Sequence, residues 1–374
     1  MGRIPTEAET ARRPELYRRA TSTRSFGGGP SAKPQIAPFC AAVSPLTGPI
    51  LGEQNGGYGA ISIVDRYVRR CQRVSMAAIA PASLPEGLPS APSVHHRLVD
   101  VASAVGPVRI HLAEAGTGEP VLLLHGWPQH WFMWRHVVAG LGGRYRLLMP
   151  DLRGFGWSQA PGTGYEPHSF AADARALLDA LGLDGVRLVG HDWGGFTAFL
   201  LGVAHPERFK RIVVFNAPPL WVPLSPRVIA SLWRTWYVTM VACPLGPAIV
   251  ASDWFVPWFI RLGRRAAVFD DTEADIYARR LGDPARAWAS AVLYRSYLRA
   301  ASDIFIRRRY RHERLTVPTL LVFGAEDFYV PRSYITGWQS HAPHMRAEFV
   351  PGCGNFLPEE RPELASSYLR EFLL

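Results

Sequence analysis

Residues 186–195 read Val-Arg-Leu-Val-Gly-His-Asp-Trp-Gly-Gly, and this stretch decides the fold class. The apolar residues of Val186–Val189 predict a buried strand, and Gly195–Ala204 predicts a helix directly after it. The glycines on both sides of His-Asp-Trp permit a very tight turn between strand and helix, because glycine has no Cβ to clash there. Such a turn lifts the side chain of Asp192 clear of the sheet. The alternative is an ordinary glycine-rich turn in which Asp192 caps the helix.

Apolar runs of strand length recur on both sides of this turn. They are Val108–Leu112, Val121–Leu124, Arg146–Met149, Arg211–Phe215, Thr319–Phe323 and Ala347–Val350. Phe170–Leu181 is a further helical stretch between two of them. Strands that alternate with helices at this spacing predict an α/β fold, with a mostly parallel central sheet and helices on both faces. Residues 96–219 and 312–374 are expected to form this core, and residues 220–311 a helical lid inserted into it.

The first 95 residues differ from the rest, with paired arginines, a Gly-Gly-Gly-Pro stretch at 27–30 and a run rich in Pro, Ala and Ser. Such low complexity predicts a disordered leader, and Met76 is the expected true start of translation. The leader lacks the apolar stretch of a secretory signal. The four cysteines are far apart in sequence, which favours neither a disulfide framework nor a zinc site. A reducing, cytoplasmic location is therefore expected.

Composition excludes several classes of protein. The chain has 374 residues, of which 48% are hydrophobic, so it is long and apolar enough to bury a sizeable core. The net charge of +10 is concentrated at the start: residues 1–75 hold 11 Lys and Arg against 5 Asp and Glu. The other arginines are scattered along the chain, whereas a nucleic-acid-binding protein gathers them on one element. We expect no nucleic-acid partner.

The stretch Trp236–Ile260 has 25 residues and a single charged side chain, Asp253. Its length is sufficient for a membrane span, but Pro244, Pro247 and Pro257 interrupt it. An apolar helical cap over a pocket is the preferred interpretation, and no membrane contact is expected.

The central residue of a strand-to-helix turn of this kind is usually serine, and here it is Asp192. A carboxylate that attacks an acyl group forms an anhydride, which is a poor route. A carboxylate that attacks an electrophilic sp³ carbon forms an alkyl ester, and water can later cleave that ester at its carbonyl. Asp192 therefore indicates epoxides or alkyl halides as substrates.

A second loop follows the apolar run Val121–Leu124 and reads His125-Gly126-Trp127-Pro128. At the carboxyl end of a strand, it is expected to bring the Trp127 N–H beside Asp192. Together with the Trp193 N–H, this donor would form an oxyanion hole for ester hydrolysis. For His125, a structural role is preferred over proton transfer.

Two more segments complete a family pattern: Asp151-Leu-Arg-Gly-Phe-Gly-Trp-Ser158 and Gly324-Ala-Glu-Asp327. With these motifs, the chain from about residue 98 to Leu374 resembles the α/β-hydrolase superfamily, specifically the HGxP-type epoxide hydrolases and their dehalogenase relatives. The resemblance implies that His125, Gly126 and Pro128 belong to the substrate loop and that Asp327 orients a catalytic histidine. It implies no metal and no organic cofactor.

The resemblance also implies two lid tyrosines that donate protons to the opening epoxide oxygen. Tyr237 and Tyr294 lie in matching contexts, and Tyr297 is the alternate. A phenol is neutral at pH 7, and its O–H stabilises a developing alkoxide. Haloalkane dehalogenases usually carry Asn or Glu where this chain has Trp127, and fluoroacetate dehalogenases usually carry Arg where it has Trp193.

One position departs from the pattern. The family places its catalytic histidine in G-x-G-H-[FW], and this chain reads Gly352-Cys-Gly-Asn355-Phe356. An amide cannot take a proton from water near neutral pH, so the general base is missing. His191, His312, His341 and His344 are poor substitutes from their places in the sequence. An introduced substitution that traps an intermediate, a natural loss of activity and a divergent chemistry all remain open.

We therefore expect an epoxide-hydrolase-like hydrolase with an apolar substrate, in a monomer or homodimer. Ring opening would give an alkyl ester on Asp192, and Asn355 would impair its hydrolysis. A dehalogenase of the same fold is the first alternative. A pseudoenzyme that binds a ligand without turnover is the second.

Overall fold

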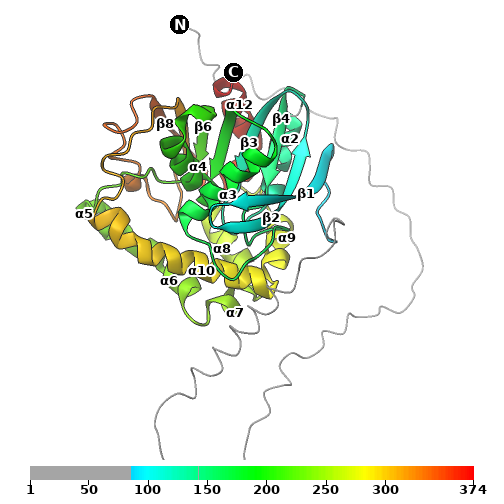
Figure 1. The fold of residues 1–374 in the computed structure, drawn as a ribbon. Coiled ribbons are helices and arrows are strands. Elements are labelled where there is room, and N and C mark those ends of the chain that lie inside the picture. The colour runs from blue at the N-terminus through cyan, green and yellow to red at the C-terminus, as the bar shows by residue number, and fades with distance from the viewer. Residues whose placement is uncertain (1–85, 142) are drawn as a thin grey trace, which may run out of the picture. The chain divides into compact units, whose positions relative to one another are not determined.

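A computed structural model describes residues 86–141 and 143–374 of the chain. Its centre is an eight-stranded sheet with the strand order β1-β2-β4-β3-β5-β6-β7-β8 (Figure 1). The strands are β1 Val94–Ser103, β2 Gly106–Ala115, β3 Glu119–Leu124, β4 Tyr145–Pro150, β5 Val186–His191, β6 Phe209–Phe215, β7 Thr319–Gly324 and β8 Met345–Val350.

The sheet is parallel except at one edge. β2 pairs antiparallel with both β1 and β4, and every other neighbouring pair is parallel. The parallel strands β3, β5, β6 and β7 are almost entirely buried, which is why they read as continuous apolar runs in the sequence. The predicted α/β fold with a mostly parallel sheet is confirmed.

Strand β1 was missed, and its composition explains why. It is an edge strand whose residues alternate between exposed and half-buried, and it contains His95, His96, Arg97 and Asp100. The expected boundary of the leader at residue 95 falls inside this strand, because β1 already pairs from Val94 with Ala115. The rest of the leader prediction, including a start at Met76, concerns residues 1–85 and lies outside the described residues.

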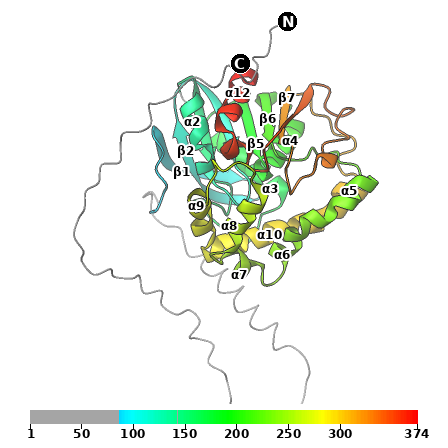
Figure 2. The same cartoon turned by 180° about the vertical axis from the view of Figure 1, so that it is seen from behind.

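Helices cover both faces of the sheet. α3 (Pro167–Ala180) and α4 (Trp193–Ala204) pack together on one face (Figure 1), and α2 (Arg135–Leu141) and α12 (Pro362–Phe372) pack together on the other (Figure 2). The short helices are η2 Trp131–Trp134, η3 Pro206–Arg208, η6 Arg332–Tyr334 and α11 Leu357–Glu360. The loops that follow β3, β5, β6, β7 and β8 all leave the same edge of the sheet, where an α/β fold binds its ligands.

The chain between β6 and β7 is a helical insertion, drawn in yellow and green beneath the sheet in Figures 1 and 2. Its helices are α5 Pro226–Ser231, η4 Leu232–Thr235, α6 Trp236–Ala242, α7 Gly246–Val250, α8 Phe255–Gly263, α9 Asp271–Leu281, α10 Pro284–Ala301 and the π-helix η5 Ser302–Ile306. The apolar stretch Trp236–Ile260 is divided into α6, α7 and the first part of α8. No helix in the described part of the chain combines the length and apolar character that crossing a bilayer requires.

Candidate active site

Asp192 lies in the turn between β5 and α4, with φ 49° and ψ −116°. This positive φ is strained for a non-glycine residue, and strain of this kind gathers at functional turns. This turn can pack against the loop after β3 only because Gly194 and Gly126 have no Cβ atom. A Cβ on Gly194 would lie 2.1 Å from the Leu124 carbonyl oxygen, and one on Gly126 would lie 2.4 Å from the Asp192 Cβ. The Asp192 side chain makes no bond that caps α4, so the alternative of an N-cap does not describe it.

The Asp192 carboxylate instead faces two backbone donors. The Trp127 N–H donates to Asp192 Oδ2 at 2.9 Å, and the Trp193 N–H also hydrogen-bonds the carboxylate. Burial and, to a smaller extent, the nearby charge of Asp327 raise the pKa of Asp192 to about 7, against the effect of these donors. The same two N–H groups are those that the sequence predicts for an oxyanion hole.

Asp327 and Asn355 are hydrogen-bonded to each other next to this turn. Asn355 Nδ2 donates to Asp327 Oδ2 at 2.9 Å, which is the contact expected of an orienting carboxylate and the side chain it orients. The other oxygen, Oδ1, accepts from the N–H groups of Tyr329 and Val330 at 2.8 and 3.0 Å. Burial raises the pKa of Asp327 to about 6. The Asn355 backbone is fixed as well, because its N–H donates to the Gly263 carbonyl.

Asn216, which belongs to none of the motifs found in the sequence, also binds Asp327. It follows the last residue of β6 with φ 48°, a conformation that asparagine tolerates better than most residues. Its Nδ2 donates to Asp327 Oδ2 at 2.9 Å and to the Gly354 carbonyl oxygen at 3.1 Å. Asp327 is therefore held in place independently of residue 355. An asparagine directly after a buried strand was the only signal in the sequence.

A largely apolar cavity lies over Asp192, and Tyr237 and Tyr294 both line it with Trp193. Their rings meet edge to face, with centroids 5.7 Å apart. Burial raises the pKa of each tyrosine well above the usual value of 10, and the charge of Asp192 adds to this, so both phenols keep their protons near neutral pH. The insertion supplies both residues, Tyr237 from α6 and Tyr294 from α10.

Further residues line the same cavity. Tyr297 lies three residues after Tyr294 on α10, and Tyr329 and Tyr334 come from the segment after β7. Tyr329 and Tyr334 were not predicted from the sequence, because no local pattern distinguishes them from core aromatics. The other lining residues are Phe196, Pro218, Pro219, Leu220, Val222, Thr235, Val238, Ile304, Phe305 and Val330.

The loop of His125, Gly126 and Pro128 supports the site and does not line this cavity. His125 is buried: its Nδ1–H donates to the Gly126 carbonyl at 2.9 Å and its Nε2 accepts from the Leu152 N–H at 2.9 Å. Both ring nitrogens are thus used: Nδ1 within the loop after β3, and Nε2 to join that loop to the loop after β4. The Trp127–Pro128 peptide bond is cis. These contacts describe a structural role for His125.

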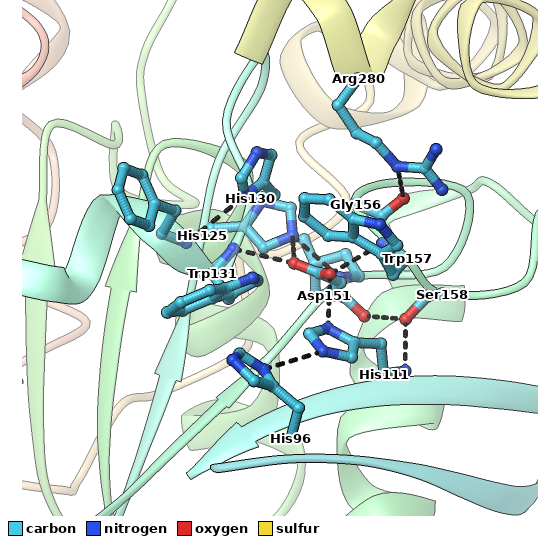
Figure 3. Close-up of polar contacts among 12 residues, drawn as sticks. His96, His111, His125, His130, Trp131, Asp151, Gly156, Trp157, Ser158 and Arg280 are labelled. Atoms are coloured by element: carbon cyan, nitrogen blue, oxygen red, sulfur yellow. Dashed lines mark hydrogen bonds and ion pairs between the residues drawn. The ribbon is translucent and has the colours of Figure 1, made fainter. Parts of the chain in front are cut away.

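The carboxylate of Asp151 accepts hydrogen bonds from several of the segments around this loop (Figure 3). Its carboxylate accepts from the N–H groups of Trp131 and Trp157, each at 2.8 Å, and from His111 Nδ1 at 2.7 Å. Burial acts to raise the pKa of Asp151, but the charge and hydrogen bond of His111 outweigh it and hold the pKa well below its usual range. A buried, ionised carboxylate therefore joins the segment after β3, which contains Trp127, to the loop after β4.

The sequence profile of the alpha/beta hydrolase fold matches residues 119–362, which is more than half of the chain. The chain belongs to the alpha/beta hydrolase fold family. Three relatives within this family are similar to it over most of its length. A soluble epoxide hydrolase from Corynebacterium sp. (strain C12) is 28% identical, over 72% of this chain and 93% of the relative.

A fluoroacetate dehalogenase from a Burkholderia species is 29% identical, over 74% of this chain and 93% of the relative. A cis-3-alkyl-4-alkyloxetan-2-one decarboxylase from Shewanella oneidensis is 27% identical, over 71% of this chain and 85% of the relative. The family match and these relatives together support a hydrolase that resembles epoxide hydrolases, with dehalogenases also among its relatives.

Asn355 stands where the family resemblance implies a catalytic histidine. None of His191, His312, His341 and His344 lines the cavity over Asp192. His191 is buried beneath the turn, where its Nε2 donates to the Asn355 carbonyl at 2.8 Å and burial lowers its pKa to about 4. Within the described residues, no cluster of His, Cys, Asp and Glu suits a metal ion.

Proposed function

We propose that this chain opens epoxides with Asp192 as the nucleophile. A carboxylate oxygen of Asp192 attacks one carbon of the ring and forms an ester bond. The ring C–O bond breaks, and its electrons go to the oxygen, which takes a proton from Tyr237 or Tyr294. The observation that carries this proposal is the placement of one carboxylate and two protonated phenols around a single apolar cavity. The helical insertion then serves as a lid over the nucleophile.

The second half-reaction, hydrolysis of the ester, is the step for which this site lacks a histidine base. Hydrolysis of the alkyl ester needs a water molecule that is deprotonated beside the ester carbonyl, with the Trp127 and Trp193 N–H groups stabilising the oxyanion. Asn355 occupies the position beside Asp327 from which a histidine would act, and an amide is not a base. The ester on Asp192 is therefore expected to form and to persist.

No metal or organic cofactor enters either step. The cytoplasmic location and the monomeric or dimeric state remain predictions.

Parallel incubation with an aryl epoxide and a haloalkane tests the choice of substrate. Epoxide consumption of one equivalent per chain, with no halide released from the haloalkane, would support the proposal. Halide release would favour a dehalogenase instead. Trp127 disfavours that outcome because its indole Nε1–H is already donated to Ser290 Oγ at 2.9 Å and so does not point at a halide. Reversible binding of either compound without an adduct would favour a binding-only protein.

The rate of adduct formation is expected to rise with pH through about 7. The raised pKa of Asp192 leaves the carboxylate protonated, and so inactive, below that value. The rate should therefore increase about tenfold per pH unit from pH 5 to 6 and become constant above pH 8. No decrease is expected below pH 9, because the pKa values of both tyrosines lie well above 10. Single-turnover epoxide consumption measures this profile.

The control for this profile is Asp327→Asn, because Asp327 has a pKa of about 6 and is close enough to affect Asp192. An inflection that persists in this variant, at a slightly lower pH because the charge of Asp327 is gone, belongs to Asp192. A rate that does not change between pH 5 and 8 in the unaltered protein would contradict the assignment of Asp192 as a buried nucleophile.

Asn355 favours a second candidate, the decarboxylation of a four-membered lactone. Asp192 would attack ring carbon C4 of an oxetan-2-one, and the ring C4–O bond would break to leave a free carboxylate on C3. Loss of that carboxylate as CO₂ supplies the electrons for a C3=C4 double bond and expels the Asp192 carboxylate. This sequence uses no water and no base, so Asn355 does not block it. Repeated turnover of a 3,4-dialkyl oxetan-2-one to alkene and CO₂, with epoxides giving only a single turnover, would favour this candidate. No alkene would exclude it.

A further inference from the structure

The outer surface of the helical insertion is unusually apolar. Thirteen large hydrophobic side chains of the described residues are exposed, and ten of them belong to residues 220–311, which form less than a third of that part of the chain. Trp233 and Trp254 are the most exposed tryptophans among them, with exposed fractions of 61% and 59%. Soluble proteins rarely leave large apolar side chains gathered on one surface unless that surface binds something.

Two helical faces carry the most prominent of these side chains. Along α5, η4 and α6, the exposed Ile229, Leu232 and Trp233 and the half-buried Trp236 follow one another at helical spacing, so they share one face. Trp254 and Trp258 share a face of the α8 segment. The two faces join, because the Trp236 and Trp258 rings are 5.5 Å apart and the Trp254 and Trp258 rings are 6.3 Å apart. We call this surface the tryptophan patch: Ile229, Leu232, Trp233, Trp236, Trp254 and Trp258.

The patch lies in the most basic part of the described chain. Residues 220–311 contain fourteen arginines and seven Asp and Glu residues, whereas residues 76–374 as a whole carry a net charge of only +4. Charges that are scattered in sequence are therefore gathered in the insertion. Arg227 and Arg265 are exposed on α5 and just beyond α8, Arg261 on α8 is paired with Asp271, and the exposed acidic residue next to the patch is Asp253. Arg234 lies over the Trp233 ring, 5.6 Å from its centroid.

This charge decides which occupant fits the patch. Residues 1–75, with their own excess of Lys and Arg, would be repelled by the insertion, and so would a second copy of the same surface. A nucleic acid would satisfy the arginines but would not bury the exposed Ile229 and Leu232. Tryptophans, aliphatic side chains and arginines on one surface match the interfacial region of a bilayer that contains anionic lipids.

We propose that the tryptophan patch docks this protein on the surface of an anionic phospholipid bilayer. The chain lies on the membrane without spanning it, which differs from our expectation of no membrane contact but agrees with the absence of a spanning helix in the described residues. Figures 1 and 2 show α5 and α6 on the side of the insertion away from the sheet, whereas α8 lies nearer the sheet and contributes Trp254 and Trp258 at its exposed first turn.

Docking in this orientation has a consequence for the substrate. Two of the helices that carry the patch, η4 and α6, also line the cavity, through Thr235, Tyr237 and Val238. Apolar electrophiles concentrate in bilayers, so a substrate of the class proposed for this site would meet the insertion from the membrane. The docking itself does not depend on which reaction Asp192 performs.

Co-sedimentation of the full chain with vesicles tests the proposal. Vesicles of equal parts phosphatidylcholine and phosphatidylglycerol are expected to bind the protein, and vesicles of phosphatidylcholine alone to bind it at least tenfold more weakly. The double variant Trp233→Ser/Trp254→Ser should lose about tenfold or more in its partition coefficient on anionic vesicles. A matched control is Val105→Ser/Leu364→Ser, which alters two exposed apolar side chains outside the insertion and should bind unchanged.

Three results would overturn the proposal. The first is no binding of the unaltered protein to anionic vesicles. The second is equal binding by the Trp233→Ser/Trp254→Ser variant, which would assign the vesicle contact to another part of the chain, such as the arginine-rich residues 1–75. The third is a dimer in light scattering that this variant alone abolishes, which would show that a second copy covers the patch.

Discussion

Replacing Asn355 with histidine is expected to convert a protein that stops after one turnover into one that forms diol continuously. General-base assistance typically contributes about 10²–10⁴-fold, so ester hydrolysis should accelerate by that factor. Asp327 should stay in position after this substitution, because Asn216, Tyr329 and Val330 hydrogen-bond its carboxylate independently of residue 355. Steady-state diol production from an aryl epoxide, compared between the two proteins, measures the effect.

Two control variants test whether a histidine at residue 355, oriented by Asp327, is what restores hydrolysis. Asn355→Gln retains an amide and should remain stalled. Asn355→His combined with Asp327→Asn should recover only part of the gain, because the new histidine would lose the carboxylate that orients it. Sustained turnover by the unaltered protein would show that another base operates, and the explanation based on Asn355 would then be wrong.

Removing both tyrosine hydroxyls is expected to abolish most of the ring opening. In Tyr237→Phe/Tyr294→Phe, the epoxide oxygen would leave as an unprotonated alkoxide in an apolar cavity, where charge is poorly stabilised. Formation of the adduct should slow by about 10²–10⁴-fold, with a smaller loss in each single variant. Single-turnover epoxide consumption gives the rates, and the melting temperatures of the variants check that they fold.

Tyr297→Phe is the matched control for this pair. Tyr297 is on the same helix as Tyr294, lines the same cavity and is also buried, with a pKa raised above its usual range by that burial. If Tyr297 only shapes the cavity, its loss should change the rate by less than tenfold. A loss as large as that of Tyr294→Phe would transfer the donor role to Tyr297.

The parts of the site that the sequence predicted are those encoded by a local pattern. The turn at Asp192 could be recognised because its close contacts exclude any side chain at Gly194, and the neighbouring strand and helix are continuous in the sequence. Asp327 and Asn355 were placed by the family resemblance and lie within hydrogen-bond distance of each other. In each case a short segment carries the whole signal.

The parts that were missed depend on contacts between distant segments. Asn216 reaches Asp327 across 111 positions of sequence, and only the pairing of β6 with β7 brings them together. Tyr334 enters the cavity from a loop whose composition does not distinguish it from packed aromatics. β1 was missed because it is an edge strand with many polar residues. The basic surface of the insertion was missed because its arginines are separated in sequence and meet only when the helices fold together.

Intact-mass spectrometry after incubation with an aryl epoxide tests the central proposal most directly. One covalent adduct per chain, equal in mass to the substrate and located on the peptide that contains Asp192, is the predicted result. The adduct should be absent in Asp192→Ala and should persist for many times the period of its formation in the unaltered protein. It should become transient in Asn355→His. Diol production without any adduct on Asp192, or an adduct on a different residue, would contradict the assignment of Asp192 as the nucleophile.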